Sequence, residues 1–225
     1  MPEASVKALR DKACEYVHGL GRGEHVFELR ASQAVLVVVD MQNFVCRPAP
    51  GRELPGLAEV MERLNSLAAG CRLQGIPVVW LRQVFHRQAG GDDAGLYRRF
   101  HREPLDPGLF EGGEAAELYA GMQVDPARDY VVAKNRYSAL APGSSRLAQV
   151  LAGLGRRQLI LGGAATNVCV ESTARDAMQR GYEVTVLADA TTAFDPLLHE
   201  ISLLNLKLFF GDVRTAAEVA RALFA

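Results

Sequence analysis

The chain has 225 residues, of which 49% are hydrophobic, and its formal net charge is -1. This length suits one domain and is short for two well-packed ones. The near-neutral charge gives no electrostatic reason to expect nucleic acid or an anionic membrane as a partner, and no apolar stretch reaches the roughly 20 residues that a membrane helix requires.

We expect a helix and an extended arm over residues 1–30, followed by a domain over residues 31–225. In this domain, short apolar runs alternate with helical patterns. Each run is continuous, which is typical of strands that are covered on both faces. A later run, Leu206–Phe210, is a candidate edge strand. The five other predicted strands are Ala34–Asp40, Pro77–Leu81, Tyr130–Lys134, Gln158–Gly162 and Glu183–Ala188.

Helical candidates lie between these runs, and glycines follow several of their ends as stop signals. The predicted helices are Leu57–Gln74, Ser144–Leu154, Asn167–Arg180 and Pro196–Leu204. This order predicts a Rossmann-like α/β fold with three α/β/α layers and a doubly wound, mostly parallel sheet of about six strands. Residues 83–128 interrupt the alternation as a long insertion, which we expect to line a pocket.

Three reactive side chains are predicted to meet at one edge of this sheet. Asp40 ends the first strand, Lys134 ends the third, and Cys169 follows the fourth within the segment GGAATNVC. In open parallel sheets, ligands bind beyond the carboxyl ends of the strands. An acid, a base and a thiol at the same edge therefore indicate nucleophilic catalysis.

Cys169 is the candidate nucleophile, because a thiol in the first turn of a helix lies at the positive end of the helix dipole, which favours the thiolate. Lys134 would favour the thiolate too, and Asp40 would accept the thiol proton. The backbone N–H groups of Ala165 and Cys169 are candidates for an oxyanion hole, worth about 3 kcal/mol per donor. Taken singly, the cysteine would more often be buried packing and the lysine a surface residue, whereas the aspartate would be a helix cap or loop anchor at even odds. Their convergence favours the catalytic interpretation.

The positions of the four cysteines and five histidines predict neither a disulfide framework nor a metal site. Cys14, Cys46, Cys71 and Cys169 lie far apart, without the spacing of metal ligands, and the five histidines are scattered. The N-terminal segment MPEASVKALRDKACEYVHGL has no apolar core of a secretion signal. We therefore expect reduced thiols and a cytoplasmic location.

Three segments resemble the signature regions of isochorismatase-like cysteine hydrolases: VVVDMQNF (37–44), VVAKNRYSAL (131–140) and LILGGAATNVCVESTARDAM (159–178). The resemblance implies an isochorismatase-like hydrolase fold with Asp40, Lys134 and Cys169 as a catalytic triad. It also implies a cis peptide bond between Ala164 and Ala165, no cofactor, and a homodimer or homotetramer. The implied reaction is a two-step hydrolysis through a thioester.

The resemblance is nearest to the ureidoacrylate amidohydrolase and biuret hydrolase branch, so the expected substrate is a small amide or ureide. It implies that Gln83 and Tyr137 contact a ureido group, which offers both N–H donors and a carbonyl acceptor. Asn167 is a third candidate contact. The alternative for Tyr137 is that it packs beneath the loop. Retention of Cys169 favours C–N hydrolysis over the isochorismate-cleaving branch that works without a thiol.

Other functions remain as alternatives. The first alternative is another substrate of the same family, an N-carbamoylsarcosine-type or nicotinamide-type amide. Nicotinamide is disfavoured, because His86 and His101 stand alone where nicotinamidases carry an aspartate with spaced histidines. A flavodoxin-like protein would use GGAAT to hold phosphate, but the segment matches no standard phosphate-binding pattern. A catalytically silent relative is a third alternative. The family pattern DxQNDF is DMQNF here, with Cys46 close behind, so the first loop is expected to differ in shape.

Overall fold

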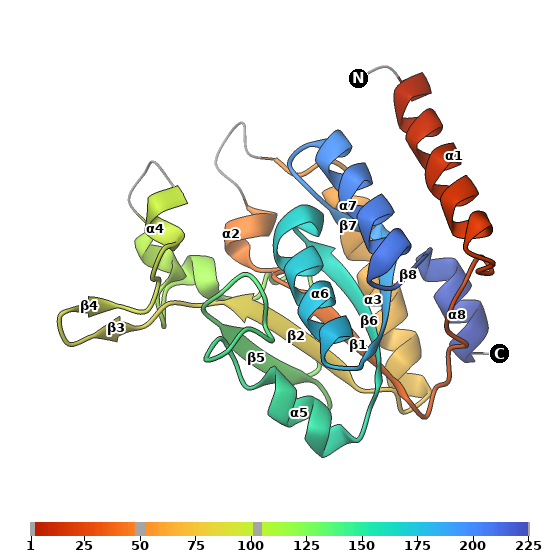
Figure 1. The fold of residues 1–225 in the computed structure, drawn as a ribbon. Helices are drawn as coiled ribbons and strands as arrows, with labels where there is room; N and C mark the ends of the chain where they lie inside the picture. The colour runs from red at the N-terminus through yellow and green to blue at the C-terminus, as the bar shows by residue number, and fades with distance from the viewer. Residues whose placement is uncertain (1–2, 48–52, 101–104, 225) are drawn as a thin grey trace.

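The computed structural model describes residues 3–47, 53–100 and 105–224. At its centre is a six-stranded sheet in the order β5-β2-β1-β6-β7-β8, in which all neighbouring strands are parallel (Figure 1). The expected doubly wound α/β fold is confirmed. The strands are β1 (Ala34–Val39), β2 (Val78–Gln83), β5 (Tyr130–Lys134), β6 (Gln158–Ala164), β7 (Glu183–Thr192) and β8 (Asp212–Arg214).

Alternate residues of the central strands enter two separate hydrophobic cores, one on each face of the sheet. In β1, Leu36 and Val38 contribute to one core, whereas Val35 and Val37 contribute to the other. The strand runs are apolar at every position because both faces are covered. The first core includes side chains of α3 (Leu57–Leu73) and α8 (Ala216–Phe224), and the second those of α5 (Leu147–Leu154), α6 (Glu171–Gln179) and α7 (Pro196–Phe209).

The predicted strand over Leu206–Phe210 is wrong, because this segment forms the last turn of α7 and the edge strand is β8. An apolar run of this length fits a buried helix end as well as a strand. The buried residues Leu203 and Leu206 lie on one helical face. Gly211 then lets the chain pass over β7, since a Cβ atom there would lie 2.5 Å from the carbonyl oxygen of Val184.

Two other predicted helices differ at their starts. The segment expected as one helix from Asn167 is a π-helical turn, Thr166–Val170, that leads into α6. The helix expected from Ser144 begins at Leu147. The π-helical turn matters for the site, because it carries Cys169.

The N-terminal segment forms α1 (Glu3–Gly19), which packs against α7. The Tyr16 ring meets the Phe209 ring edge-on with centroids 6.2 Å apart. Arg22, just beyond α1, donates hydrogen bonds to the carbonyl oxygens of Leu208 and Lys207. The end of α7 thus anchors this segment.

The insertion between β2 and β5 lies beyond the carboxyl end of β2 (Figure 1). It has a small core of its own, in which Phe85, Leu109 and Phe110 are buried. Its elements are the hairpin β3 (Arg87–Gln88) and β4 (Gly91–Asp92), α4 (Tyr97–Phe100), and two 3-10 turns, Pro107–Leu109 and Glu114–Ala116. The short α2 (Asn43–Cys46) follows β1 and contacts the second 3-10 turn.

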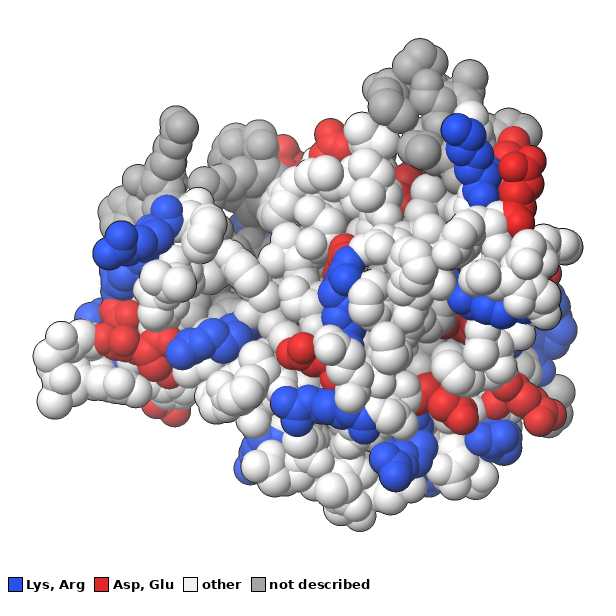
Figure 2. All heavy atoms as spheres, viewed as in Figure 1, with Lys and Arg blue, Asp and Glu red and all other residues white. Residues whose placement is uncertain are grey.

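Charged side chains of both signs are interspersed over the face drawn in Figure 2, in keeping with the net charge of -1. Among the helices of the described part of the chain, none is both long enough and apolar enough to cross a membrane.

Candidate active site

Asp40 stands where the chain leaves the sheet at the carboxyl end of β1. Its backbone has φ 51°, in the left-handed region that few residues other than glycine adopt. Its N–H donates to the carbonyl oxygen of Leu81 at 3.0 Å, which ties it to the end of β2. Asp40 is 3% exposed. Such conformations persist where the surroundings hold them, commonly at functional sites.

Lys134 ends β5, in register with Gln83 at the end of β2. Its ammonium is fully buried and pairs with the Asp40 carboxylate, with 2.8 Å between Nζ and Oδ2. The same Nζ atom lies 2.9 Å from Gln83 Oε1, 3.1 Å from the Arg136 carbonyl oxygen and 3.4 Å from Cys169 Sγ. The structure therefore brings the three predicted triad residues together.

Close packing between the ends of β6 and β1 positions the π-helical turn that carries Cys169. The φ of Gly163 is +110°, and a Cβ atom at this position would lie 2.1 Å from the Val39 carbonyl oxygen. Glycine is therefore required for the two strand ends to approach. The following Ala164–Ala165 peptide is cis, as the resemblance implied. The π-helical turn then presents Cys169 to the cavity.

The pKa of the Cys169 thiol is shifted in the direction opposite to the expectation. Burial raises the pKa of the Cys169 thiol, and the Lys134 ammonium only partly opposes this effect, while the Asp40 carboxylate adds to it. Burial also opposes the charge of Lys134, but the nearby Asp40 and Cys169 outweigh it, so the pKa of Lys134 is raised. The surroundings of Cys169 thus disfavour the thiolate that the helix end and the lysine were expected to favour, because desolvation outweighs both effects.

Gln42 is a site residue that the sequence reasoning missed. Its side chain clamps the backbone of Gln83 on both sides: Oε1 accepts from the Gln83 N–H at 2.7 Å, and Nε2 donates to the Gln83 carbonyl oxygen at 3.1 Å. A third bond runs from Nε2 to the Ala115 carbonyl oxygen in the insertion. The sequence signals were its place two residues after Asp40 and its match to the glutamine of the family pattern DxQNDF.

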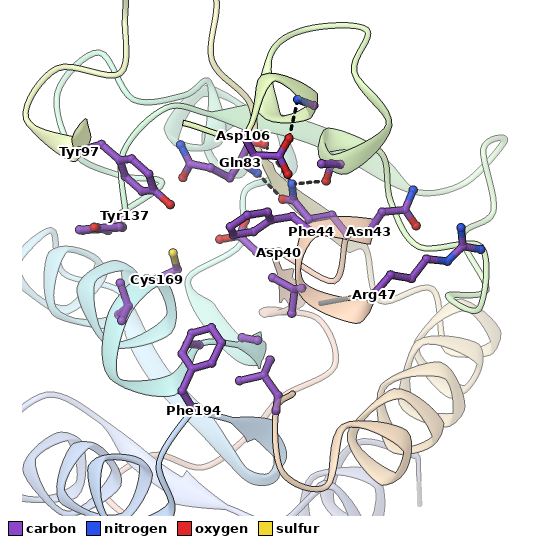
Figure 3. A pocket seen from close by; sticks show the side chains of 18 of the residues that line it. Asp40, Asn43, Phe44, Arg47, Gln83, Tyr97, Asp106, Tyr137, Cys169 and Phe194 are labelled. Carbon is purple, nitrogen blue, oxygen red and sulfur yellow. Dashed lines mark hydrogen bonds between the residues drawn. The ribbon is translucent and has the colours of Figure 1, made fainter. Parts of the chain in front are cut away.

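A cavity of about 870 Å³ opens beside the triad (Figure 3). The predicted residues Asp40, Gln83, Tyr137, Ala165 and Cys169 all line it, whereas Asn167 is not among the described residues that do. Further lining residues, which the sequence reasoning did not single out, come from α2, from the insertion including α4, and from the loop before α7. They include Asn43, Phe44, Tyr97, Asp106 and Phe194.

Two tyrosines form one wall of the cavity. The Tyr97 and Tyr137 rings lie 5.6 Å apart between centroids, and Tyr97 also meets Phe85 at 5.1 Å. Burial raises the pKa of the Tyr137 hydroxyl, and the sulfur of Cys169 adds to this effect. Tyr137 thus remains a neutral phenol that can both donate and accept a hydrogen bond. Within the described ranges, no group of three or more His, Cys, Asp and Glu side chains is arranged to hold a metal ion.

Comparison with known proteins assigns the chain to a family. The model of the isochorismatase domain matches residues 34–218. A ureidoacrylate amidohydrolase of Methylorubrum extorquens is 34% identical over 209 residues, which cover 86% of this chain and 84% of that protein.

Two solved structures share the fold. A cysteine hydrolase from Pseudomonas syringae pv. phaseolicola superposes with a TM-score of 0.77 and 27% identity, covering 88% of this chain and 95% of the other. An N-carbamoylsarcosine amidase from Thermoplasma acidophilum has a TM-score of 0.67 and 25% identity, covering 82% and 96%. The chain therefore belongs to the isochorismatase family and is a hydrolase of that family.

Proposed function

We propose that this chain hydrolyses a carbon–nitrogen bond of a small carbamoyl or ureido compound, with Cys169 as the nucleophile. The observation that carries the proposal is the convergence of three side chains beside the cavity that Asp40 and Cys169 line. Lys134 Nζ lies 2.8 Å from Asp40 Oδ2 and 3.4 Å from Cys169 Sγ. The names of two relatives, a ureidoacrylate amidohydrolase and an N-carbamoylsarcosine amidase, support an amide-type bond in a carbamoyl compound.

The first step of the proposed reaction starts from the neutral thiol. Asp40 Oδ1 is buried and has no hydrogen-bond partner among the described residues, so it is available to accept the proton of Cys169. The sulfur attacks the substrate carbonyl carbon, and the backbone N–H groups of Ala165 and Cys169 hold the oxyanion. The carbon–nitrogen bond then breaks, and the leaving nitrogen takes the proton from Asp40.

The second step returns the free enzyme. A water molecule gives a proton to Asp40 and attacks the thioester carbonyl, which breaks the carbon–sulfur bond. The proton then passes from Asp40 to the sulfur of Cys169. For a urea-type substrate the products are ammonia and a carbamate. The buried ammonium of Lys134 stays paired with the Asp40 side chain through these transfers, with Nζ 2.8 Å from Oδ2.

Gln83 supports recognition of a carbamoyl group. The Lys134 ammonium can only donate hydrogen bonds, so the Gln83 Oε1 atom faces it and the amide nitrogen faces away. That Nε2 atom is buried and lacks a hydrogen-bond partner within the described residues. Asn43 Oδ1, on another cavity residue, is likewise an unpaired acceptor in that set. A carbamoyl group offers the matching carbonyl and N–H groups.

The proposal is tested by ammonia release from ureidoacrylate, biuret, N-carbamoylsarcosine and nicotinamide. We expect turnover of at least one carbamoyl compound, loss of turnover in Cys169→Ala, and full activity in Cys14→Ala, whose cysteine is exposed on α1. Acid quenching during turnover should trap an acyl adduct on the wild-type protein. Full activity of Cys169→Ala would show that another group is the nucleophile.

Two alternatives have their own signatures in this experiment. A preference for nicotinamide would move the assignment to another amide of the same family. Failure of every compound, without any trapped adduct, would favour a non-catalytic binding subunit.

A further inference from the structure

The cavity beside Cys169 extends well beyond what a carbamoyl group fills. Its volume of about 870 Å³ lies toward the upper end of the 300–1,000 Å³ of typical ligand pockets, which hold drug-sized molecules. Buried, unpaired polar atoms that suit a carbamoyl group are found on Asp40, Gln83 and Asn43 within the described residues. The rest of the volume therefore faces a different part of the substrate.

Much of the remaining lining is apolar, although Arg47, Asp106 and Glu114 add charged side chains to it. Phe44 and Val45 come from α2, Leu54 from the segment before α3, and Phe194 from the loop before α7. In the view of Figure 3, Tyr97 and Tyr137 lie on one side of the Cys169 sulfur, while Phe194 lies across the cavity from them. These apolar side chains come from segments far apart in the chain, yet all line the same cavity.

Phe194 is 56% exposed although it lines the cavity. An aromatic ring left in contact with water is stabilised when an apolar group covers it, at roughly 25 cal/mol for each Å² buried. Apolar surface that is grouped in a cavity with polar atoms at one end is typical of ligand sites. A carbamoyl group bound beside Cys169 is too small to cover the apolar side chains that line the rest of the cavity.

We propose that the substrate carries an apolar substituent, about the size of a phenyl ring, on its carbamoyl group, and that Phe44 and Phe194 contact this substituent. This inference rests on the proposed function and narrows it to monosubstituted ureas and related carbamoyl compounds with a bulky apolar end. Methyl-sized substituents would leave the apolar wall hydrated and would gain little of the binding energy that it offers.

The test compares benzylurea with methylurea, which share the carbamoyl group and differ in the apolar end. We expect benzylurea to have the higher kcat/KM by about tenfold or more, since one methylene in an apolar pocket is worth about tenfold or more. Phe194→Ala should reduce this preference. Phe209→Ala is the matched control, because Phe209 is similarly exposed, at 55%, but does not line the cavity. It should keep the wild-type preference.

Binding is measured separately, by calorimetric titration of the two ureas into Cys169→Ser. Tighter binding of benzylurea supports the inference even if neither urea is hydrolysed, in which case only the proposed reaction fails. Hydrolysis of both ureas with equal kcat/KM would overturn the inference and leave the proposed function standing. Equal binding of the two ureas, or no binding of either, would overturn the inference as well.

Discussion

Removal of the lysine ammonium from the triad should destabilise the whole domain. In Lys134→Met, the Asp40 carboxylate loses a partner at 2.8 Å while its side chain stays 5% exposed. A buried charge left without its partner costs about 3–5 kcal/mol. With an m value of about 3 kcal/mol/M, the urea midpoint should fall by roughly 1–2 M. Trp80 is the chain's one tryptophan and is fully buried, so its fluorescence reports unfolding.

A double-mutant cycle separates the ion pair from the packing of the lysine chain. Asp40→Asn is the suitable partner change, because asparagine tolerates the left-handed backbone at this position. Each single variant leaves one buried charge unpaired, whereas Lys134→Met/Asp40→Asn leaves neither. The double variant should therefore be more stable than the sum of the two single losses predicts, by at least about 2 kcal/mol. Strictly additive losses would refute the argument, because they would show that the two charges do not stabilise each other.

Three further predictions concern other parts of the structure. Gly163→Ala should lower the free energy of unfolding by at least about 2 kcal/mol, because its Cβ atom would meet the β1 backbone. Gly153→Ala in α5, with nothing within 4 Å, should instead be neutral or stabilising by up to about 1 kcal/mol in the same urea melts. Burial lowers the pKa of His199, which hydrogen-bonds the threonine of the π-helical turn at 2.8 Å. Its contribution to stability is present above the unfolded value near 6.5 and is lost as pH falls, so urea melts of His199→Gln should show a smaller decrease from pH 7 to pH 5. An unchanged decrease would contradict this. Asp129→Ala should destabilise the protein by about 3–5 kcal/mol in thermal or urea melts, since it leaves the buried Arg72 guanidinium unpaired; a loss below about 1 kcal/mol would contradict the burial argument.

The raised pKa of the Cys169 thiol affects how the pH dependence of activity is interpreted. If the thiolate forms only by proton transfer to Asp40, then the resting thiol does not react readily with alkylating reagents at neutral pH. In that case, the proton of Cys169 passes to Asp40 only when the substrate is bound. Such a site would differ from cysteine sites in which a helix N-terminus and a cation stabilise the thiolate before the substrate binds.

Much of the fold and the placement of the triad followed from the sequence alone. Continuous apolar runs predicted the parallel strands, and the alternation of strands and helices placed Asp40, Lys134 and Cys169 at one edge. This inference succeeds because a parallel sheet with crossover helices brings all its carboxyl ends to the same side. The prediction of a strand over Leu206–Phe210 was wrong, because a short apolar segment is equally typical of a buried helix end and of a strand.

Only the tertiary structure decided the direction in which the pKa of Cys169 is shifted, the Gln42 clamp on Gln83, and the apolar side chains, including Phe194, that line the cavity. Desolvation of a thiol depends on atoms from several elements, and so does the shape of a cavity. Local periodicity reports which face of an element is buried, but it carries no information on which distant side chains share one volume. The sequence therefore determined which groups meet, and the packing determined how strongly they are desolvated and the space that they enclose.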